Sequence, residues 1–177
     1  MRKRPALALA VLTVASVTAL MPTAANAADT NVTFTLSGGS LTLTAPASAA
    51  LTAGGLGVGG TTATGQLGTS TVTDTRGALT HTVTVTMSTT DFTTIGGDTI
   101  TASNATGYSG VATPSGVGLA VPTLTGQTIG AAGGATILQL TGVIGSASAS
   151  YSPTVSVAVP ADAVAGDYSG VVTQTAA

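Results

Sequence analysis

The chain has 177 residues, of which 44% are hydrophobic, 6% charged and 3% aromatic, with no cysteine, no tryptophan and one histidine. Soluble domains usually carry about 25% charged residues, so the surface must rely on uncharged polar groups, for which the recurring threonines are the candidates. The composition excludes a disulfide scaffold, a thiolate metal site, a cysteine nucleophile and a multi-histidine metal centre, and we expect no cofactor.

The N-terminal segment has the features of a secretory signal peptide. Arg2, Lys3 and Arg4 form a basic start, and the apolar run over residues 6–20 is shorter than the roughly 20 residues needed to span a bilayer. The small-x-small pattern that ends at Ala27 is typical of a cleavage site. We therefore expect residues 1–27 to be removed and the mature chain to be secreted, with no membrane attachment after cleavage.

Cleavage would leave the mature chain strongly depleted of cations. Its one arginine, Arg76, stands against six aspartates, which gives a formal charge of −5. A nucleic-acid-binding surface needs several cations to neutralise phosphates. The charge therefore excludes nucleic acid as a partner, and it excludes attraction to anionic lipid or anionic wall polymers unless a divalent cation bridges. The partners that we expect are cell-wall polymer or another surface protein.

Alternation of apolar residues with threonine is the clearest structural pattern in the mature chain. A period of two with β-branched residues indicates half-buried strands, with one face on a core and one in water. The long alternating runs are 32–36, 41–44, 79–87 and 154–159, and the shorter candidates are 70–73, 99–102, 135–140 and 169–173.

Glycine-rich stretches connect these strands. Residues 52–68 predict a long loop or a poorly packed strand pair, and residues 110–134 contain two prolines that are unsuited to central strands. Short strands separated by such turns indicate a sandwich or a barrel. We predict an all-β fold: a single antiparallel, Greek-key-like β-sandwich domain over residues 28–177.

A few polar residues invite a catalytic interpretation. His81 could work with Asp74 or Asp91 and a serine, but its place in the alternation beside Leu79 and Val83 favours a structural histidine at the core margin. No Gly-x-Ser-x-Gly elbow is present. Asp74 and Arg76 lie two residues apart and could pair in a turn, for which we expect a structural role.

Two further aspartates flank a glycine pair. Asp91 and Asp98 surround Gly96 and Gly97, which could form a hairpin that brings the two carboxylates together for glycosidase chemistry or Ca²⁺ binding. A solvated turn is the interpretation that we favour. We therefore expect no catalytic residue, no metal ligand and no enzymatic activity.

The stretch over residues 151–173 is the most specific part of the sequence. It predicts a strand that ends at Pro160, a tight crossover through Gly166 and a closing strand opened by Tyr168. A tyrosine at such a corner commonly returns its hydroxyl to the crossover backbone in Greek-key sandwiches. Pro160, Gly166 and Tyr168 are therefore expected to be structural.

Together with VTDTRG (72–77) and TDFT (90–93), this stretch resembles the WxL-like domains of secreted Gram-positive, notably actinobacterial, surface proteins. The resemblance spans residues 32–173. It implies a noncovalent association with the cell wall. The family tryptophans are absent: the first position falls within 81–83, and the second is Tyr151.

These observations predict a secreted, non-catalytic structural or interaction protein of the cell surface. The alternative is a carbohydrate-binding module or an accessory domain of a wall-active enzyme. Sugar-binding platforms usually need exposed aromatic rings, for which Tyr108, Tyr151 and Tyr168 are the candidates.

Overall fold

The computed structural model describes residues 33–35, 38–54, 61–117, 121, 124, 126–130 and 133–177. The chain divides into two compact units, Met1–Thr35 and Leu36–Ala177. Residues 1–27, including the expected cleavage site at Ala27, lie outside the described residues. No helix among the described residues is long and apolar enough to cross a membrane.

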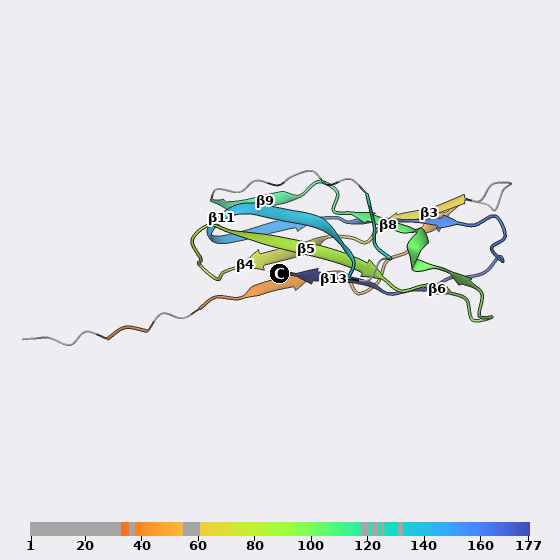
Figure 1. Cartoon of the computed structure of the whole chain (residues 1–177), viewed down its shortest axis with the longest axis horizontal. Coiled ribbons are helices and arrows are strands. Elements are labelled where there is room, and N and C mark those ends of the chain that lie inside the picture. Colours follow the sequence, from red (N-terminus) through yellow and green to blue (C-terminus); the bar gives the residue numbers. More distant parts are fainter. Residues whose placement is uncertain are drawn as a thin grey trace, which may run out of the picture. The chain divides into compact units, whose positions relative to one another are not determined.

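The second unit is built from antiparallel strands, which confirms the predicted all-β sandwich (Figure 1). In chain order the elements are β1 (Leu41–Thr44), β2 (Thr52–Ala53), β3 (Thr61–Gln66), β4 (Ser70–Asp74), β5 (His81–Thr89), β6 (Phe92–Thr93), β7 (Thr99–Ile100), the 3₁₀ helix η1 (Ala102–Asn104), β8 (Ala105–Tyr108), β9 (Thr113–Val117), β10 (Gln127–Thr128), β11 (Ala135–Tyr151), β12 (Thr154–Val159) and β13 (Val172–Ala176).

Neighbouring strands come from distant parts of the sequence. The first sheet has the order β1-β4-β11-β5-β13, with β9 also paired to β11, and the second has the order β10-β8-β12-β3-β2. The edge strands β1 and β13 of the first sheet contact each other, so this sheet is nearly closed. A small hairpin, β6–β7, forms a third sheet.

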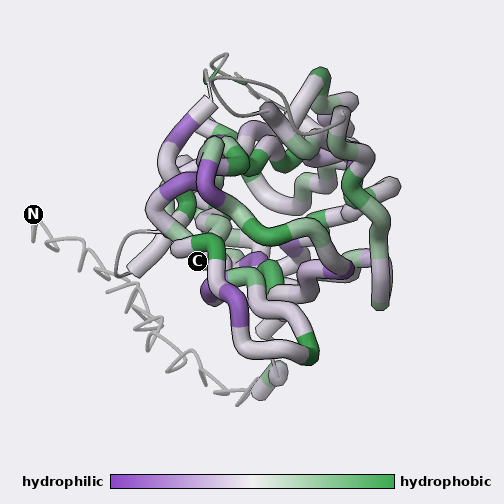
Figure 2. Tube along the Cα trace, turned by 90° about the vertical axis from the view of Figure 1, so that its right-hand side faces the viewer, coloured by the Kyte–Doolittle hydropathy of each residue, from purple (hydrophilic) through white to green (hydrophobic). Residues whose placement is uncertain are grey.

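Alternation sorts side chains between a common core and water. In β5, Val83, Val85 and Met87 are buried, whereas the threonines between them are less buried or exposed. In β12, Val155 and Val157 are buried in the same way. The inward faces of both sheets contribute to one core cluster. Figure 2 shows that the described trace carries few strongly hydrophilic residues and is largely neutral to hydrophobic.

The 17-residue strand β11 organises the first sheet. Its first half pairs with β5, and its second half lies between β4 and β9. The pairing register shifts between Leu140 and Val143 and again between Ile144 and Ala147. Gly142 and Gly145, which lie within these shifts, have φ of 69° and 73°. This left-handed backbone, which glycine adopts without strain, forms the bulges that re-aim the strand from β5 to β9.

Two of the predicted strands need correction. Residues 33–35 of the expected strand 32–36 lie outside any strand and are exposed, while residues 32 and 36 lie outside the described part. The strand expected over 79–87 begins only at His81, because Thr80 has φ of 20° and interrupts the extended backbone. Leu79 is consequently 89% exposed and does not share the core face of Val83.

The other expected strands differ mainly in their bounds. The prediction over 154–159 matches β12, and 41–44 matches β1. The run 135–140 is only the start of β11, and 99–102 divides into β7 and the beginning of η1. Residues 52–68 contain β2 and β3, which pair with each other as the strand-pair interpretation predicted. Residues 110–134, expected to be mainly loop, contain the short strands β9 and β10, and β9, which contains Pro114, pairs with β11 alone among the described strands.

Candidate functional site

Two features of the described chain are candidates for function: a buried charged cluster and an apolar cavity. The cluster is centred on Asp74, the last residue of β4, whose side chain is 1% exposed. In β4 the inward positions are Ser70, Val72 and Asp74, so the strand pattern points this carboxylate into the core.

Arg76 folds back onto this carboxylate. Its backbone N–H donates to Asp74 Oδ1 at 2.9 Å, which closes an Asx turn. Its guanidinium donates from Nη2 to Oδ2 at 2.8 Å and from Nε to Oδ1 at 3.1 Å. The side-chain hydrogen bonds from Arg76 hold the pKa of Asp74 well below its usual range, although burial acts in the opposite direction. The same bonds raise the pKa of Arg76.

His81 completes the cluster from the start of β5. Its Nε2 lies 2.6 Å from Asp74 Oδ2, and its Nδ1 is buried with no hydrogen-bond partner in the described part of the chain. A neutral ring that donates from Nε2 to the carboxylate leaves Nδ1 as a bare lone pair. A Ser–His–Asp relay needs the second ring nitrogen to face a nucleophile. The geometry therefore fits an ion-pair cluster that satisfies a buried carboxylate.

The other aspartates considered for chemistry serve local structure. Gly96 and Gly97 form the β6–β7 turn, as the sequence suggested. The register pairs Phe92 with Ile100, so Asp91 and Asp98 do not lie opposite each other in this hairpin. Asp91 Oδ1 accepts from the Ala102 backbone at 2.7 Å, and Asp98 exchanges hydrogen bonds with Thr94. Among the described residues, no three histidine or acidic side chains are grouped as metal ligands.

The predicted corner lies in the connection between β12 and β13. Pro160 follows the last residue of β12, and its carbonyl accepts from the Ala163 N–H at 3.1 Å. The Tyr168 hydroxyl donates to the Val164 carbonyl at 2.8 Å, and its half-buried ring packs against the core. A Cβ on Gly166 would lie 3.1 Å from the Thr94 side chain, so the crossover passes close to the β6–β7 hairpin.

One detail of this corner differs from the prediction. Tyr168 does not open the closing strand. Ser169 makes an isolated bridge with Thr93, and β13 begins only at Val172. The backbone pairs first with β6 and then with β5, because β6 follows β5 closely in the chain and the closing segment runs antiparallel along both.

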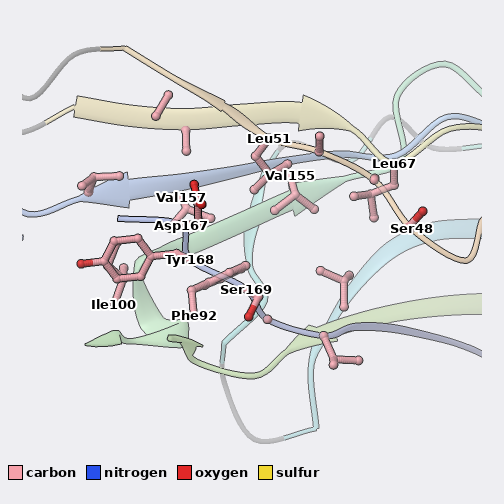
Figure 3. A pocket seen from close by; sticks show the side chains of 18 of the residues that line it. Ser48, Leu51, Leu67, Phe92, Ile100, Val155, Val157, Asp167, Tyr168 and Ser169 are labelled. Atoms are coloured by element: carbon pink, nitrogen blue, oxygen red, sulfur yellow. The ribbon is translucent and has the colours of Figure 1, made fainter. Parts of the chain in front are cut away.

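The second candidate feature is a cavity of about 820 Å³ beside this corner. Its walls come from the inward face of the second sheet, from the β6–β7 hairpin, from the segment that links β1 to β2 and from the stretch 164–174. In Figure 3, Tyr168, Phe92 and Ile100 lie toward one end of the cavity, and Leu51, Val155 and Leu67 extend toward the other.

Most side chains of the lining are aliphatic, a minority are polar, and very few are charged. Ala63, Val155, Val157 and Val159 face it from β3 and β12. Asp167 is the one charged side chain among the described lining residues. A concave, mostly apolar cavity within the roughly 300–1,000 Å³ range of ligand sites is the default position for binding. Sequence reasoning missed this site, because its walls come from segments separated by more than 100 residues.

The three tyrosines have different environments. Tyr151 is 2% exposed and donates to Gln174 Oε1 at 2.8 Å. Gln174 Nε2 in turn donates to Ser70 at 3.2 Å. Burial raises the pKa of Tyr151 to about 12. Tyr108, on β8, is 40% exposed. Of the three candidate rings, Tyr108 alone lies open on the surface of the described chain.

Comparison with known proteins gives few matches. No protein-family model matches the chain, and no curated protein matches it. Among solved structures, a family 123 glycoside hydrolase from Clostridium perfringens, described for its hydrolysis of glycolipid glycans, is similar over 67% of this chain and 19% of its own length. The identity is 21% and the TM-score is 0.36. This chain therefore spans about a fifth of that enzyme's length.

Proposed function

We propose that the protein is a secreted, non-catalytic interaction module of the cell surface that works by binding. The observation that supports this most is the apolar cavity. Its described lining contains no histidine and one carboxylate, that of Asp167. General acid–base and glycosidase chemistry use at least two positioned titratable groups. The cavity therefore has the shape of a binding site without a reactive pair.

The charged cluster supports the same proposal. Asp74, Arg76 and His81 are engaged with one another, and the His81 nitrogen that faces away from the carboxylate is buried. The Nδ1 of His81 is buried and its Nε2 is bonded to Asp74, so neither ring nitrogen is open to a substrate. The cluster is better suited to fixing the turn between β4 and β5.

The wall association implied by the resemblance to WxL-like domains is part of this proposal. The test is co-sedimentation of the mature protein with purified cell wall, beside a panel of soluble glycans. We expect it to sediment with the wall, and His81→Ala to sediment equally if it stays folded. Glycan cleavage, or activity lost in a folded His81→Ala protein, would contradict the non-catalytic assignment.

A carbohydrate-binding module is the alternative. The environments of the tyrosines support it less, because Tyr151 is buried and Tyr168 is tied to Val164. A stacking platform would then depend on Tyr108. Soluble-glycan binding that is abolished by Tyr108→Ala would favour the alternative over wall or protein binding.

The expected export is tested separately. Mass spectrometry of the culture supernatant should detect a mature chain that begins at Ala28. A secreted chain that still begins at Met1 would contradict the cleavage prediction.

A further inference from the structure

The cavity beside the Tyr168 corner has a definite ligand chemistry. We propose that it binds a single aliphatic chain that carries an uncharged head group, such as the acyl chain of a neutral lipid. This rests on the proposed binding function, to which it adds a ligand class, but it does not depend on wall association.

The interior of the cavity favours a saturated hydrocarbon. Leu51, Leu67 and Val159 are half-buried and offer aliphatic surface to the cavity, whereas Val155 and Val157, which are 0% and 3% exposed, are already packed in the core. Burying apolar ligand surface against such aliphatic side chains is favourable by about 25 cal/mol per Å².

Polar side chains are a minority of the lining, and Gln174 is one of them. The Gln174 side chain is already engaged on both sides, since it accepts from Tyr151 and donates to Ser70. A polar ligand group buried without a hydrogen bond costs free energy. The other lining side chains are mostly aliphatic and favour an alkyl chain.

The mouth of the cavity provides a path to the surface. Val164 and Val171 line the cavity and are 53% and 62% exposed, so its apolar lining continues to solvent. The lining segment at 46–50 consists of proline, alanine and serine, whose short side chains leave room for a linear ligand. Residues 46–50 belong to no strand.

Charge determines the head group. Asp167 is exposed and lines the cavity, whereas Arg76, the one described lysine or arginine, lies outside its lining and is paired with Asp74. A carboxylate or phosphate head would meet like charge and no counter-cation. An uncharged head avoids this repulsion, which is why we infer a neutral lipid rather than a free fatty acid.

The direct test is native mass spectrometry of the mature protein after monomyristoylglycerol is delivered from cyclodextrin. We expect a one-to-one complex and a higher melting temperature, because a ligand that binds only the folded state stabilises it. Ala63→Phe should weaken binding at least tenfold by filling the cavity from β3. The matched control is Thr62→Phe, which places the same ring on the outward face of the strand and should bind normally.

The charge argument has its own pair of variants. Myristate should bind the wild type at least tenfold more weakly than monomyristoylglycerol. Asp167→Lys should reduce this difference in affinity between the two lipids. Asp162→Lys makes the same charge change at an exposed position outside the described lining and should leave the difference unchanged. An equal reduction in both variants would refute the head-group assignment.

Several results would overturn the proposal. One is the absence of any complex with either lipid, even if wall sedimentation succeeds; that result would leave the proposed surface function standing. Another is lipid binding unchanged in a folded Ala63→Phe protein. A third is a dimer in light scattering that Ala63→Phe dissociates, which would assign the cavity to a second copy. If Ala63→Phe does not fold, Val159→Phe fills the same space from β12.

Discussion

The cluster around Asp74 gives the sharpest stability prediction. Asp74→Asn keeps the shape of the side chain and its Asx turn but removes the charge. The new amide Nδ2 would face donors on Arg76 and His81 that now point at a carboxylate. To accept from that amide, His81 would have to move its proton to Nδ1, which is buried with no partner in the described chain.

The expected cost follows from these contacts. The Arg76 side chain is 39% exposed, so water can replace much of the hydrogen bonding that it loses in Asp74→Asn. The main losses are the charge-assisted bond between His81 and Asp74 and the new unsatisfied N–H at His81. A hydrogen bond to a charged group is worth about 1.5–3 kcal/mol, and a buried unpaired donor costs about 1–3 kcal/mol. We expect Asp74→Asn to lose about 3 kcal/mol, a large part of a typical total of about 5–15 kcal/mol.

The prediction has a characteristic pH dependence. Because the folded-state pKa of Asp74 is lowered, its contribution is fully present above the unfolded-state pKa of about 3.9. It is then lost progressively as the pH falls toward the lower folded-state value. The stability gap between wild type and Asp74→Asn should therefore be constant near neutral pH and shrink once the pH drops below about 4.

Urea denaturation followed by circular dichroism measures this gap at each pH. Asp162→Asn is the matched control, because it removes the same charge from an exposed position, where substitutions usually stay within about 0.5 kcal/mol. If Asp74→Asn unfolds at the same urea concentration as Asp162→Asn, or if the gap persists unchanged in acid, the cluster does not stabilise the fold as we argue.

Three further predictions concern other parts of the sandwich. Tyr168→Phe should cost about 1 kcal/mol through the lost hydrogen bond to Val164, and Tyr168→Ala about 3 kcal/mol because a half-buried core ring is removed; a melt of Tyr168→Ala equal to wild type would remove the corner assignment. Because burial raises the pKa of Tyr151 to about 12, the free energy of unfolding should fall as the pH rises above about 10. The wild type should show a phenolate absorbance that titrates near pH 12 and that Tyr151→Phe lacks. Gly130→Ala should cost about 3 kcal/mol because its Cβ would collide with the Ala102 backbone, whereas Gly126→Ala meets open space and should melt like wild type; equal melts for these two glycine variants would contradict the packing at Gly130.

Part of the Asp74 cluster could be predicted from the sequence. Asp74 and Arg76 are two residues apart, a spacing that permits an Asx turn and a local ion pair. The contact with His81 depends on where β5 begins. That start is set by the backbone at Thr80 and by the pairing of His81 with Val143 of β11. Neither feature is encoded in the local alternation, so the choice among possible partners for His81 required the tertiary structure.

The sequence alone determined which residues of the regular strands face the core. A period of two is a local property, and it identified Val155 and Val157 of β12 and Val83 and Val85 of β5 as inward-facing. It also predicted a corner through Pro160 and Gly166, because backbone constraints act within a few residues.

Only the tertiary structure decided which patterned segments find a partner strand and where the cavity lies. Residues 33–35 carry the same alternation as β1 but pair with nothing in the described chain. The second half of β11, rich in glycine, alanine and serine, has a weak local pattern and yet is held between two strands. The cavity is likewise assembled from segments far apart in sequence. The physical reason is that strand pairing depends on hydrogen bonds between distant segments, whereas alternation reports only which way a side chain points once a strand exists.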